Sequence, residues 1–153
     1  MREILFKGKR IDNGKWVEGY YYKISETTYC FKEDYERKPV PEHHYILQER
    51  MTDWGLPNQM VQIEIDPKTL CQFTGMTDKN GKRIWENDIV EAWSQGSRAI
   101  GTVKQRVDGL WIMSPAWQNH EFWELKPNSN GETTVEVLVN AFDNPELLQE
   151  EHK

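Results

Sequence analysis

The side chains that could bind a metal or transfer a proton are few and scattered in this sequence. His43 and His44 follow Glu42, and His120 precedes Glu121. Adjacent residues of a strand point to opposite faces, so one metal ion could hardly take both His43 and His44. The H-x-H and H-E-x-x-H spacings of zinc sites do not occur. An enzyme would need the fold to bring His43 or His44 beside His120 and a carboxylate.

Carboxylates gather in the run that begins at Asp78 and includes Glu86 and Asp88. In a calcium-binding EF-hand loop the glycine is the sixth residue, whereas counting from Asp78 makes Gly81 the fourth. Asp78-Lys-Asn-Gly81 therefore predicts a tight turn. Glu86 and Asp88 would lie on one side of an extended strand, where capping of backbone groups is commoner than acid–base chemistry.

Signatures of nucleophilic catalysis and phosphate binding do not occur in this sequence. It contains no G-x-S-x-G, no G-x-G-x-x-G and no P-loop. Cys30 and Cys71 lie in different segments without C-x-x-C spacing, so we expect two reduced thiols in the core. The sequence thus predicts no enzyme, no cofactor and no metal.

Aromatic residues are plentiful, with seven Trp, six Tyr and five Phe against a hydrophobic content of only 37%. Because each aromatic buries a large area, we expect an aromatic-rich core. Exposed rings could also stack on bases, sugars or a protein partner. The tryptophans considered for such a platform are Trp85, Trp93, Trp111, Trp117 and Trp123.

The binding residues that we predict are Trp117, Phe122 and Tyr35. Trp117 belongs to the loop Pro-Ala-Trp-Gln-Asn and is the tryptophan that we expect to be exposed. The loops Lys32–Glu42 and Glu49–Met60 carry prolines, a glycine and many polar side chains, and we expect them to share in a binding surface.

The charge pattern disfavours nucleic acid as a partner. The net charge is −6, and most of it comes from residues 76–153, which carry eight basic and thirteen acidic side chains. Lys7, Lys9 and Arg10, with Arg2 nearby, form the one basic cluster, whereas a dedicated nucleic-acid binder has a basic face. No apolar run is as long as a membrane span and no signal peptide is evident, so we expect a cytoplasmic protein.

Turn signals divide residues 1–75 into an N-terminal antiparallel β region. Asp12-Asn-Gly-Lys15 predicts a type I′ hairpin turn. Lys32–Pro41 is highly charged and predicts an exposed loop. The strands expected are Met1–Phe6, Trp16–Ile24, Tyr29–Phe31, His43–Gln48 and Val61–Ile65.

Residues 76–153 predict a small SH3-like β-barrel, because five or so short strands follow one another between Gly- and Asn-rich turns. The strands expected are Ile84–Trp93, Ala99–Val107, Leu110–Met113, Phe122–Leu125 and Thr133–Phe142. Asp143-Asn-Pro145 predicts the start of a short C-terminal helix that runs to about Glu150. The class is mainly β (α+β), and one continuous domain is the alternative to two.

The run Phe73–Val90, FTGMTDKNGKRIWENDIV, resembles the signature TGL-x-DKNGK-x-IYEGDIV of YopX-like proteins, which phages and prophages of Gram-positive bacteria encode. The segments Phe6–Trp16 and Asn140–Leu148 also resemble the ends of that family. Asn87 replaces the signature's glycine, and asparagine is the residue other than glycine best suited to a left-handed conformation. The family has no established activity, so the resemblance implies no functional residue.

Together these observations predict a non-enzymatic phage or prophage accessory protein that binds a host or phage protein. The alternative is a nucleic-acid module in which exposed aromatics and the cluster Lys7, Lys9 and Arg10 grip a single strand. Self-association is a further option, because Ile4–Phe6 could leave an unpaired sheet edge.

Overall fold

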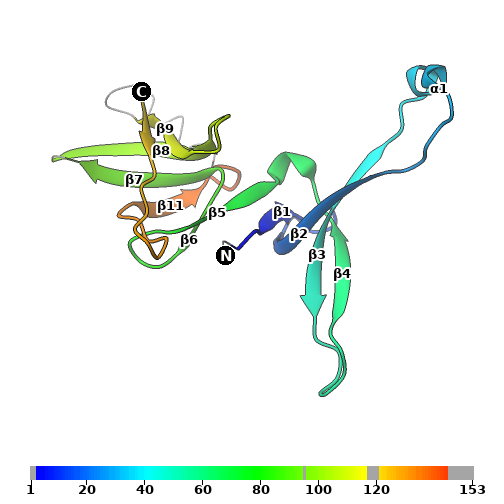
Figure 1. The fold of residues 1–153 in the computed structure, drawn as a ribbon, viewed down its shortest axis with the longest axis horizontal. Helices are drawn as coiled ribbons and strands as arrows, with labels where there is room; N and C mark the ends of the chain where they lie inside the picture. Colours follow the sequence, from blue (N-terminus) through cyan, green and yellow to red (C-terminus); the bar gives the residue numbers. More distant parts are fainter. Residues whose placement is uncertain (1–2, 95, 117–120, 145–153) are drawn as a thin grey trace. The chain divides into compact units, whose positions relative to one another are not determined.

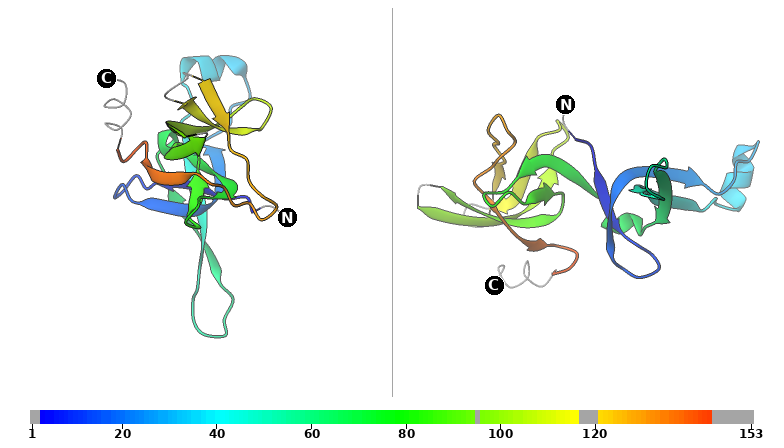
Figure 2. Two further views of the ribbon diagram at one scale, coloured as in Figure 1. Left: turned by 90° about the vertical axis from the view of Figure 1, so that its left-hand side faces the viewer. Right: turned by 90° about the horizontal axis from the view of Figure 1, so that it is seen from below.

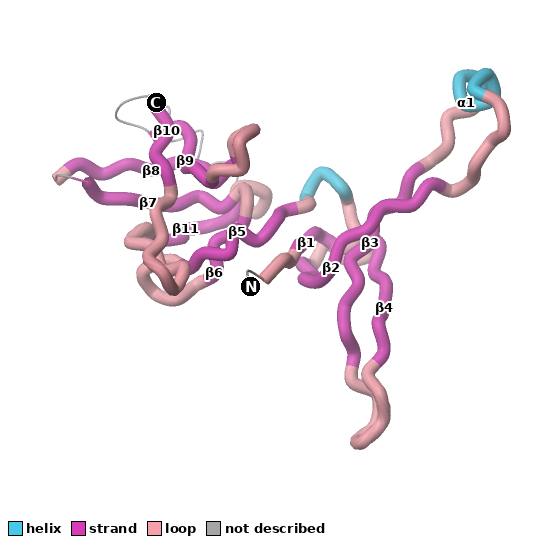
Figure 3. Tube along the Cα trace, in the orientation of Figure 1, coloured by secondary structure: helices cyan, strands magenta, loops and turns pink. Residues whose placement is uncertain are grey.

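The computed structural model describes residues 3–94, 96–116 and 121–144. The chain divides into two compact units: an N-terminal unit, Leu5–Leu70, and a C-terminal unit that comprises the described parts of Met1–Ile4 and Cys71–Lys153. Strands dominate both units, so the protein is mainly β (Figure 3). A division into separate domains 1–75 and 76–153 stays a prediction. No helix in the described part of the chain is long and apolar enough to cross a membrane.

Four antiparallel strands form the N-terminal unit in the order β4-β3-β2-β1 (Figure 1). They are β1 (Phe6–Lys9), β2 (Trp16–Ser25), β3 (Glu42–Arg50) and β4 (Gln59–Glu64), followed by the 3₁₀ turn η1 (Pro67–Thr69). The predicted hairpin turn joins β1 to β2, with Gly14 at a φ of 70°. The small core of the unit centres on Val17, Ile46 and Ile65.

The segment between β2 and β3 differs from the prediction. Tyr29–Phe31 is not a strand, and the following residues form a short helix, α1 (Lys32–Arg37), instead of a loop. Acidic residues in its first turn and Arg37 in its last turn suit the helix dipole. The Tyr29 N–H donates to the Tyr35 hydroxyl at 2.9 Å, which directs this backbone group away from any strand partner. Cys30 is exposed, so only Cys71 is the buried thiol that we expected.

The C-terminal unit contains a five-stranded antiparallel sheet in the order β10-β9-β8-β7-β11, and a hairpin of β5 and β6. The strands are β5 (Cys71–Thr77), β6 (Arg83–Trp85), β7 (Asp88–Ser94), β8 (Ser97–Gln105), β9 (Trp111–Ala116), β10 (Glu121–Glu124) and β11 (Glu136–Asn140). Asn87 adopts the predicted left-handed conformation, with a φ of 69° between β6 and β7.

The sheet of the C-terminal unit is not shown to be a closed barrel. Within the described ranges no pairing joins β10 to β11, which are the two ends of the strand order. The segment that leads into β11 is bonded to the end of β5, where the Thr133 N–H donates to the Thr77 carbonyl at 2.9 Å. SH3-like closure therefore stays a prediction. The predicted C-terminal helix lies outside the described residues.

The core is aliphatic, which corrects the expectation of an aromatic-rich interior. Its most deeply buried side chains are Ile46, Ile65, Ile84, Ile89, Met113, Val90, Val103 and Cys71. Only three aromatics, Phe73, Trp85 and Trp111, are among the buried apolar residues that the structure describes. Alternating Val and Ile residues fill the inner faces of short strands, and most aromatics are left at edges and tips.

Asp78 links the turn after β5 to β11. Its Oδ1 accepts the N–H groups of Asn80 and Lys82, both at 2.8 Å, and its Oδ2 accepts the Val137 N–H at 3.1 Å. Burial by itself would raise the pKa of this carboxyl, but the three backbone amides outweigh burial and hold the pKa below its usual value. Asp88 acts in the same way on Trp85, whose N–H it accepts at 2.8 Å. These carboxylates cap backbone groups, as the spacing predicted.

We predict that Asp78→Asn lowers the free energy of unfolding by about 2–4 kcal/mol at neutral pH, because it loses charge-assisted bonds to buried amides. The folded pKa of Asp78 lies below its unfolded value, so this stabilisation is complete above the unfolded pKa of about 4 and is lost as pH falls through the folded pKa. Urea unfolding of the wild-type protein and the variant, from about pH 2 to about pH 7, measures the difference between their free energies of unfolding. A difference that stays constant down to the lowest pH would contradict the assignment.

Candidate interaction groove

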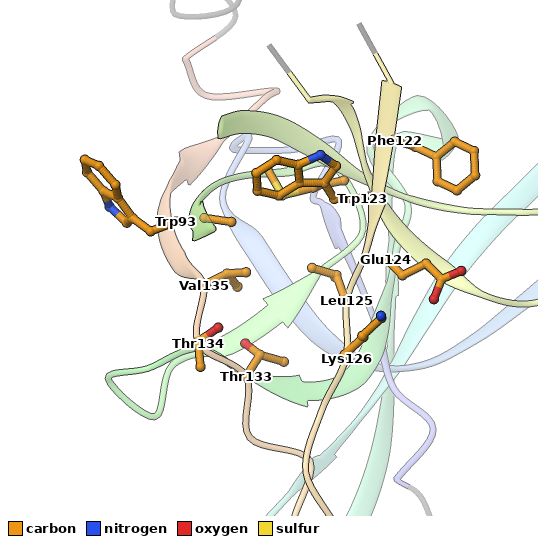
Figure 4. Close-up of a pocket in the computed structure, with 11 residues that line it drawn as sticks. Trp93, Phe122, Trp123, Glu124, Leu125, Lys126, Thr133, Thr134 and Val135 are labelled. Carbon is orange, nitrogen blue, oxygen red and sulfur yellow. The ribbon is translucent and has the colours of Figure 1, made fainter. Parts of the chain in front are cut away.

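A groove of about 570 Å³ opens in the C-terminal unit between β10 and the segment that leads into β11 (Figure 4). Leu125 on one side faces Val135 on the other, and Ala92 and Met113 line it from β7 and β9. The other lining residues are Trp93, Phe122, Trp123, Glu124, Lys126, Thr133 and Thr134. The groove thus lies between the two ends of the strand order, where no strand pairing occurs in the described chain.

Hydrogen bonds fix both walls of the groove. On the β10 side, the Leu125 N–H donates to the Trp111 carbonyl at 3.0 Å. On the opposite side, the Thr133 hydroxyl donates to the Thr77 carbonyl at 2.8 Å, and the Lys79 N–H donates to the Val135 carbonyl at 2.9 Å. These bonds hold the walls apart from within the unit, so the groove needs no ligand to form.

The buried side chains that line the groove are mainly apolar. Ala92, Met113, Leu125 and Val135 are buried and belong to the main core cluster of this unit. Trp123 is half-buried and packs against the same cluster, with its indole over the groove (Figure 4). The groove is therefore an exposed extension of the core, which is the usual character of a site that binds apolar side chains.

Trp93 provides a large aromatic surface at the rim. Its side chain is 62% exposed, although its indole N–H donates to the Glu91 carboxylate at 2.9 Å. Glu91 is held in turn by Arg98, at 2.8 Å. This chain of polar contacts restrains an exposed indole, and restrained tryptophans are common among residues that dominate binding energy.

Phe122, which the sequence predicted as a binding residue, lies at the edge of the groove. It is 46% exposed, and its ring is turned away from Trp123 (Figure 4). The Arg106 guanidinium lies 5.0 Å from the centroid of the Phe122 ring. Phe122 therefore lies on the outer face of β10, with its ring against the Arg106 guanidinium, and Trp123 lies on the inner face.

The backbone of β10 is open on its outer side. The Leu125 N–H points to β9, and successive residues of a strand alternate, so the Glu124 N–H points away from β9 toward the groove. It has no backbone partner in the described part of the chain. Glu124 and Lys126 are exposed charges on this side of the strand. An unpaired strand edge of this kind can accept an extended segment of another protein.

The three predicted binding residues belong to different parts of the chain. Phe122 lies at the groove, Tyr35 belongs to the N-terminal unit, and Trp117 lies outside the described residues. Of the two predicted loops, the first contains α1 and the second is irregular only between the end of β3 and the start of β4. Trp93 and Trp123 were noticed as aromatics, but no local pattern reveals Leu125 and Val135, because the sheet register alone brings them together.

His43 and His44 are held in separate hydrogen bonds, and His120, the third histidine considered for chemistry, lies outside the described residues. His43 Nδ1 lies 2.6 Å from Glu64 Oε2 and His44 Nδ1 lies 2.7 Å from the Tyr21 hydroxyl, on opposite faces of β3. The hydrogen bond to Glu64, aided by Glu26, raises the pKa of His43. Among residues that the structure describes, no group of three or more His, Cys, Asp or Glu side chains could hold a metal ion.

Comparison with known proteins decides the family. A model of the family described as "YopX protein" matches residues 5–149, nearly the whole chain. The chain belongs to the YopX protein family. The match confirms the resemblance seen in the run Phe73–Val90.

Other comparisons of this YopX family member add little. A crystal structure of protein EF1440 from Enterococcus faecalis aligns over 97% of this chain and 99% of that one, with 14% identity and a TM-score of 0.46. No curated protein matches.

We predict that the exposed aromatics contribute little to folding. Trp93→Ser, Phe122→Ala and Tyr35→Ala should each change the free energy of unfolding by less than about 1 kcal/mol, because all three residues are exposed and none belongs to a core cluster. Leu125→Ala should cost about 2–4 kcal/mol, because this side chain is 5% exposed and part of the core. Chemical unfolding of the four variants tests this; coincident destabilisation by Trp93→Ser would place that residue in the core.

Proposed function

We propose that this chain is a non-enzymatic interaction module of a phage or prophage, and that the groove between β10 and the segment before β11 binds a protein. The observation that carries the proposal is the groove itself: an open groove with buried apolar side chains beneath it, a restrained tryptophan at its rim and an unpaired strand edge along its side. The family supplies the phage context, and action in the cytoplasm of the host cell is part of the same proposal.

The groove suits an extended segment of the partner. The outward N–H and C=O of Glu124 offer main-chain hydrogen bonds, and Leu125, Val135 and Trp123 offer apolar contacts for alternate side chains. Such a segment would occupy the place of the strand pairing that an SH3-like barrel would need to close. The net charge of −5 carried by residues 71–153 favours a partner segment that includes Lys or Arg.

A nucleic-acid module is the second candidate, because Lys7 and Lys9 lie over the ring of Trp16, at 4.6 and 5.3 Å from its centroid. Arg10 is less suited to phosphate, since it forms an ion pair with Asp12 at 2.8 Å. Nucleic-acid binding by this cluster would weaken steeply with salt and with Lys7→Gln or Lys9→Gln.

Affinity capture from a host lysate, with and without nuclease, separates the two candidates. We expect a protein partner that stays bound after nuclease treatment. Trp93→Ser should weaken its binding by about tenfold or more, as removal of a dominant interface residue does. Val107→Ser is the matched control, because Val107 is a fully exposed apolar residue of the same unit that lies in the turn between β8 and β9 and does not line the groove. Recovery of nucleic acid that nuclease abolishes, with no retained protein, would favour the second candidate and overturn the first.

A further inference from the structure

The N-terminal unit carries a projecting hairpin arm, made of β3, the loop 51–58 and β4 (Figures 1 and 2). The pairing of β2 with β3 ends at Leu47, whereas β3 pairs with β4 as far as Arg50 and Gln59. The outer part of the arm is therefore a two-stranded ribbon. Such a ribbon is at best marginally stable in water unless something packs against it.

The loop at the tip of the arm holds apolar side chains in solvent. The Leu56 N–H donates to the Asp53 carbonyl at 3.0 Å across a turn in which Gly55 has a φ of 82°. The Thr52 hydroxyl bonds to the Pro57 carbonyl at 2.9 Å. The turn places Trp54 at its apex, 98% exposed. Around it Met51, Leu56 and Met60 are also exposed, by 75%, 57% and 50%.

The outer edge of β4 is open and lacks the usual protection against pairing. The Ile65 N–H points to β3, where it donates to the His44 carbonyl at 2.9 Å, so by alternation the backbone groups of Met60 and Gln62 point outward. Neither has a backbone partner among the described residues. The stretch Trp54–Ile63 contains no charged residue, although 29% of the chain is charged. Edge strands normally carry lysine, proline or a bulge to prevent association.

We propose that β4 is the contact between two copies of this chain, with β4 of one protomer added antiparallel to β4 of its partner across a two-fold axis. An axis beside Val61 would place Met60 opposite the partner's Gln62, and Gln62 opposite the partner's Met60. The outward N–H and C=O groups of both residues would then be bonded in each copy. The contact is closed and self-complementary, and it does not rest on the function proposed for the groove.

A second copy accounts for the tip as well as for the edge. Beyond the paired stretch, the partner's loop would reach the base of the arm, where Ile11 donates its N–H to the Glu64 carbonyl at 3.2 Å. A hollow of about 490 Å³ lies there, lined by Arg10–Asp12, Gln48–Arg50 and Val61–Glu64. Ile11 is 60% exposed beside it and would meet the apolar tip. Each protomer thus supplies both a projecting loop and a place for the partner's loop.

The charges of the arm fit this occupant. Two copies of a chain with a net charge of −6 repel one another over most of their surfaces, but not along an edge that carries no charge. Between Met51 and Ile63 there is no Lys or Arg, and Arg50 is the one cation on the outer part of the arm, whereas nucleic acid or anionic lipids are usually bound through several cations. The sequence suggested self-association through Ile4–Phe6, whereas this proposal places it at β4, where the outward backbone groups of Met60 and Gln62 have no backbone partner among the described residues.

Sedimentation equilibrium of the full chain, from about 1 μM to about 500 μM, tests the proposal over the range of typical weak to moderate dimers. We expect the mass to rise with concentration from 18.2 kDa toward that of a dimer. Met60→Pro removes an outward N–H that only an added strand would use, and Trp54→Ser removes the exposed indole. Each should raise the dimer dissociation constant by about tenfold or more, a change that sedimentation resolves. Val107→Ser, the control in the other unit, should leave it unchanged.

Unfolding followed by circular dichroism establishes that the variants are folded. Should Met60→Pro perturb β4, Trp54→Ser still decides, because a side chain that is 98% exposed contributes little to folding. A wild-type chain that stays at 18.2 kDa at every concentration would overturn the proposal. A dimer that persists in both variants would also overturn it, as would binding of Trp54 to phosphatidylcholine vesicles without any self-association.

Discussion

The carboxylate of Asp78 joins parts of the C-terminal unit that lie far apart in the sequence. It closes the turn Asp78–Lys82 through two amides and fixes β11 through Val137, so the turn and β11 cannot move independently. The neighbouring Lys79 N–H adds a bond to Val135. The wall of the groove opposite β10 is therefore set by a buried charge that backbone amides satisfy, which is a more rigid device than apolar packing alone.

This constraint explains why the groove stays open. Bonds to Thr77 and Lys79 fix the position of the segment Thr133–Val135, which does not pair with β10 in the described chain. The edge of β10 is left with unpaired backbone groups beside apolar side chains. The hairpin arm of the N-terminal unit has the same physical character, because β4 ends its sheet and the outward backbone groups of Met60 and Gln62 have no backbone partner in the described chain. In each unit the open edge is where we place an interaction.

Local signals sufficed for most of the fold. Asn13-Gly14 and Asp78–Gly81 were identifiable as turns because Asn-Gly pairs favour a positive φ, which both glycines adopt. Alternation in Thr133–Phe142 indicated the strand that the structure places at β11. The error at Tyr29–Phe31 arose because β-forming residues are adjacent there, while the partner strand that would have paired with them does not exist in the described residues. Propensity gives no information about such a partner.

The groove and the arm could be predicted only in part. Phe122 was named from the sequence as a binding residue, which stays a prediction, whereas Leu125 and Val135 come together through pairings that no local pattern encodes. The expectation of an aromatic-rich core was wrong for a related reason. Composition counts Trp54 and Trp93 but does not show that one lies at the tip of a hairpin and the other at a groove rim. Exposure is a property of the assembled sheet.

Residue-resolved amide hydrogen exchange of the dilute protein tests the central claim that both edges are open. The account predicts that the amides of Gln62 and Glu124 exchange as fast as those of exposed loops, while their neighbours Ile63 and Leu125, bonded within the sheets, are protected. The amide of Val137, bonded to the buried Asp78, should be among the slowest. Protection of Gln62 and Glu124 equal to that of Ile63 and Leu125 at the lowest concentration would contradict the account, because it would mean that these edges are already covered within a single chain.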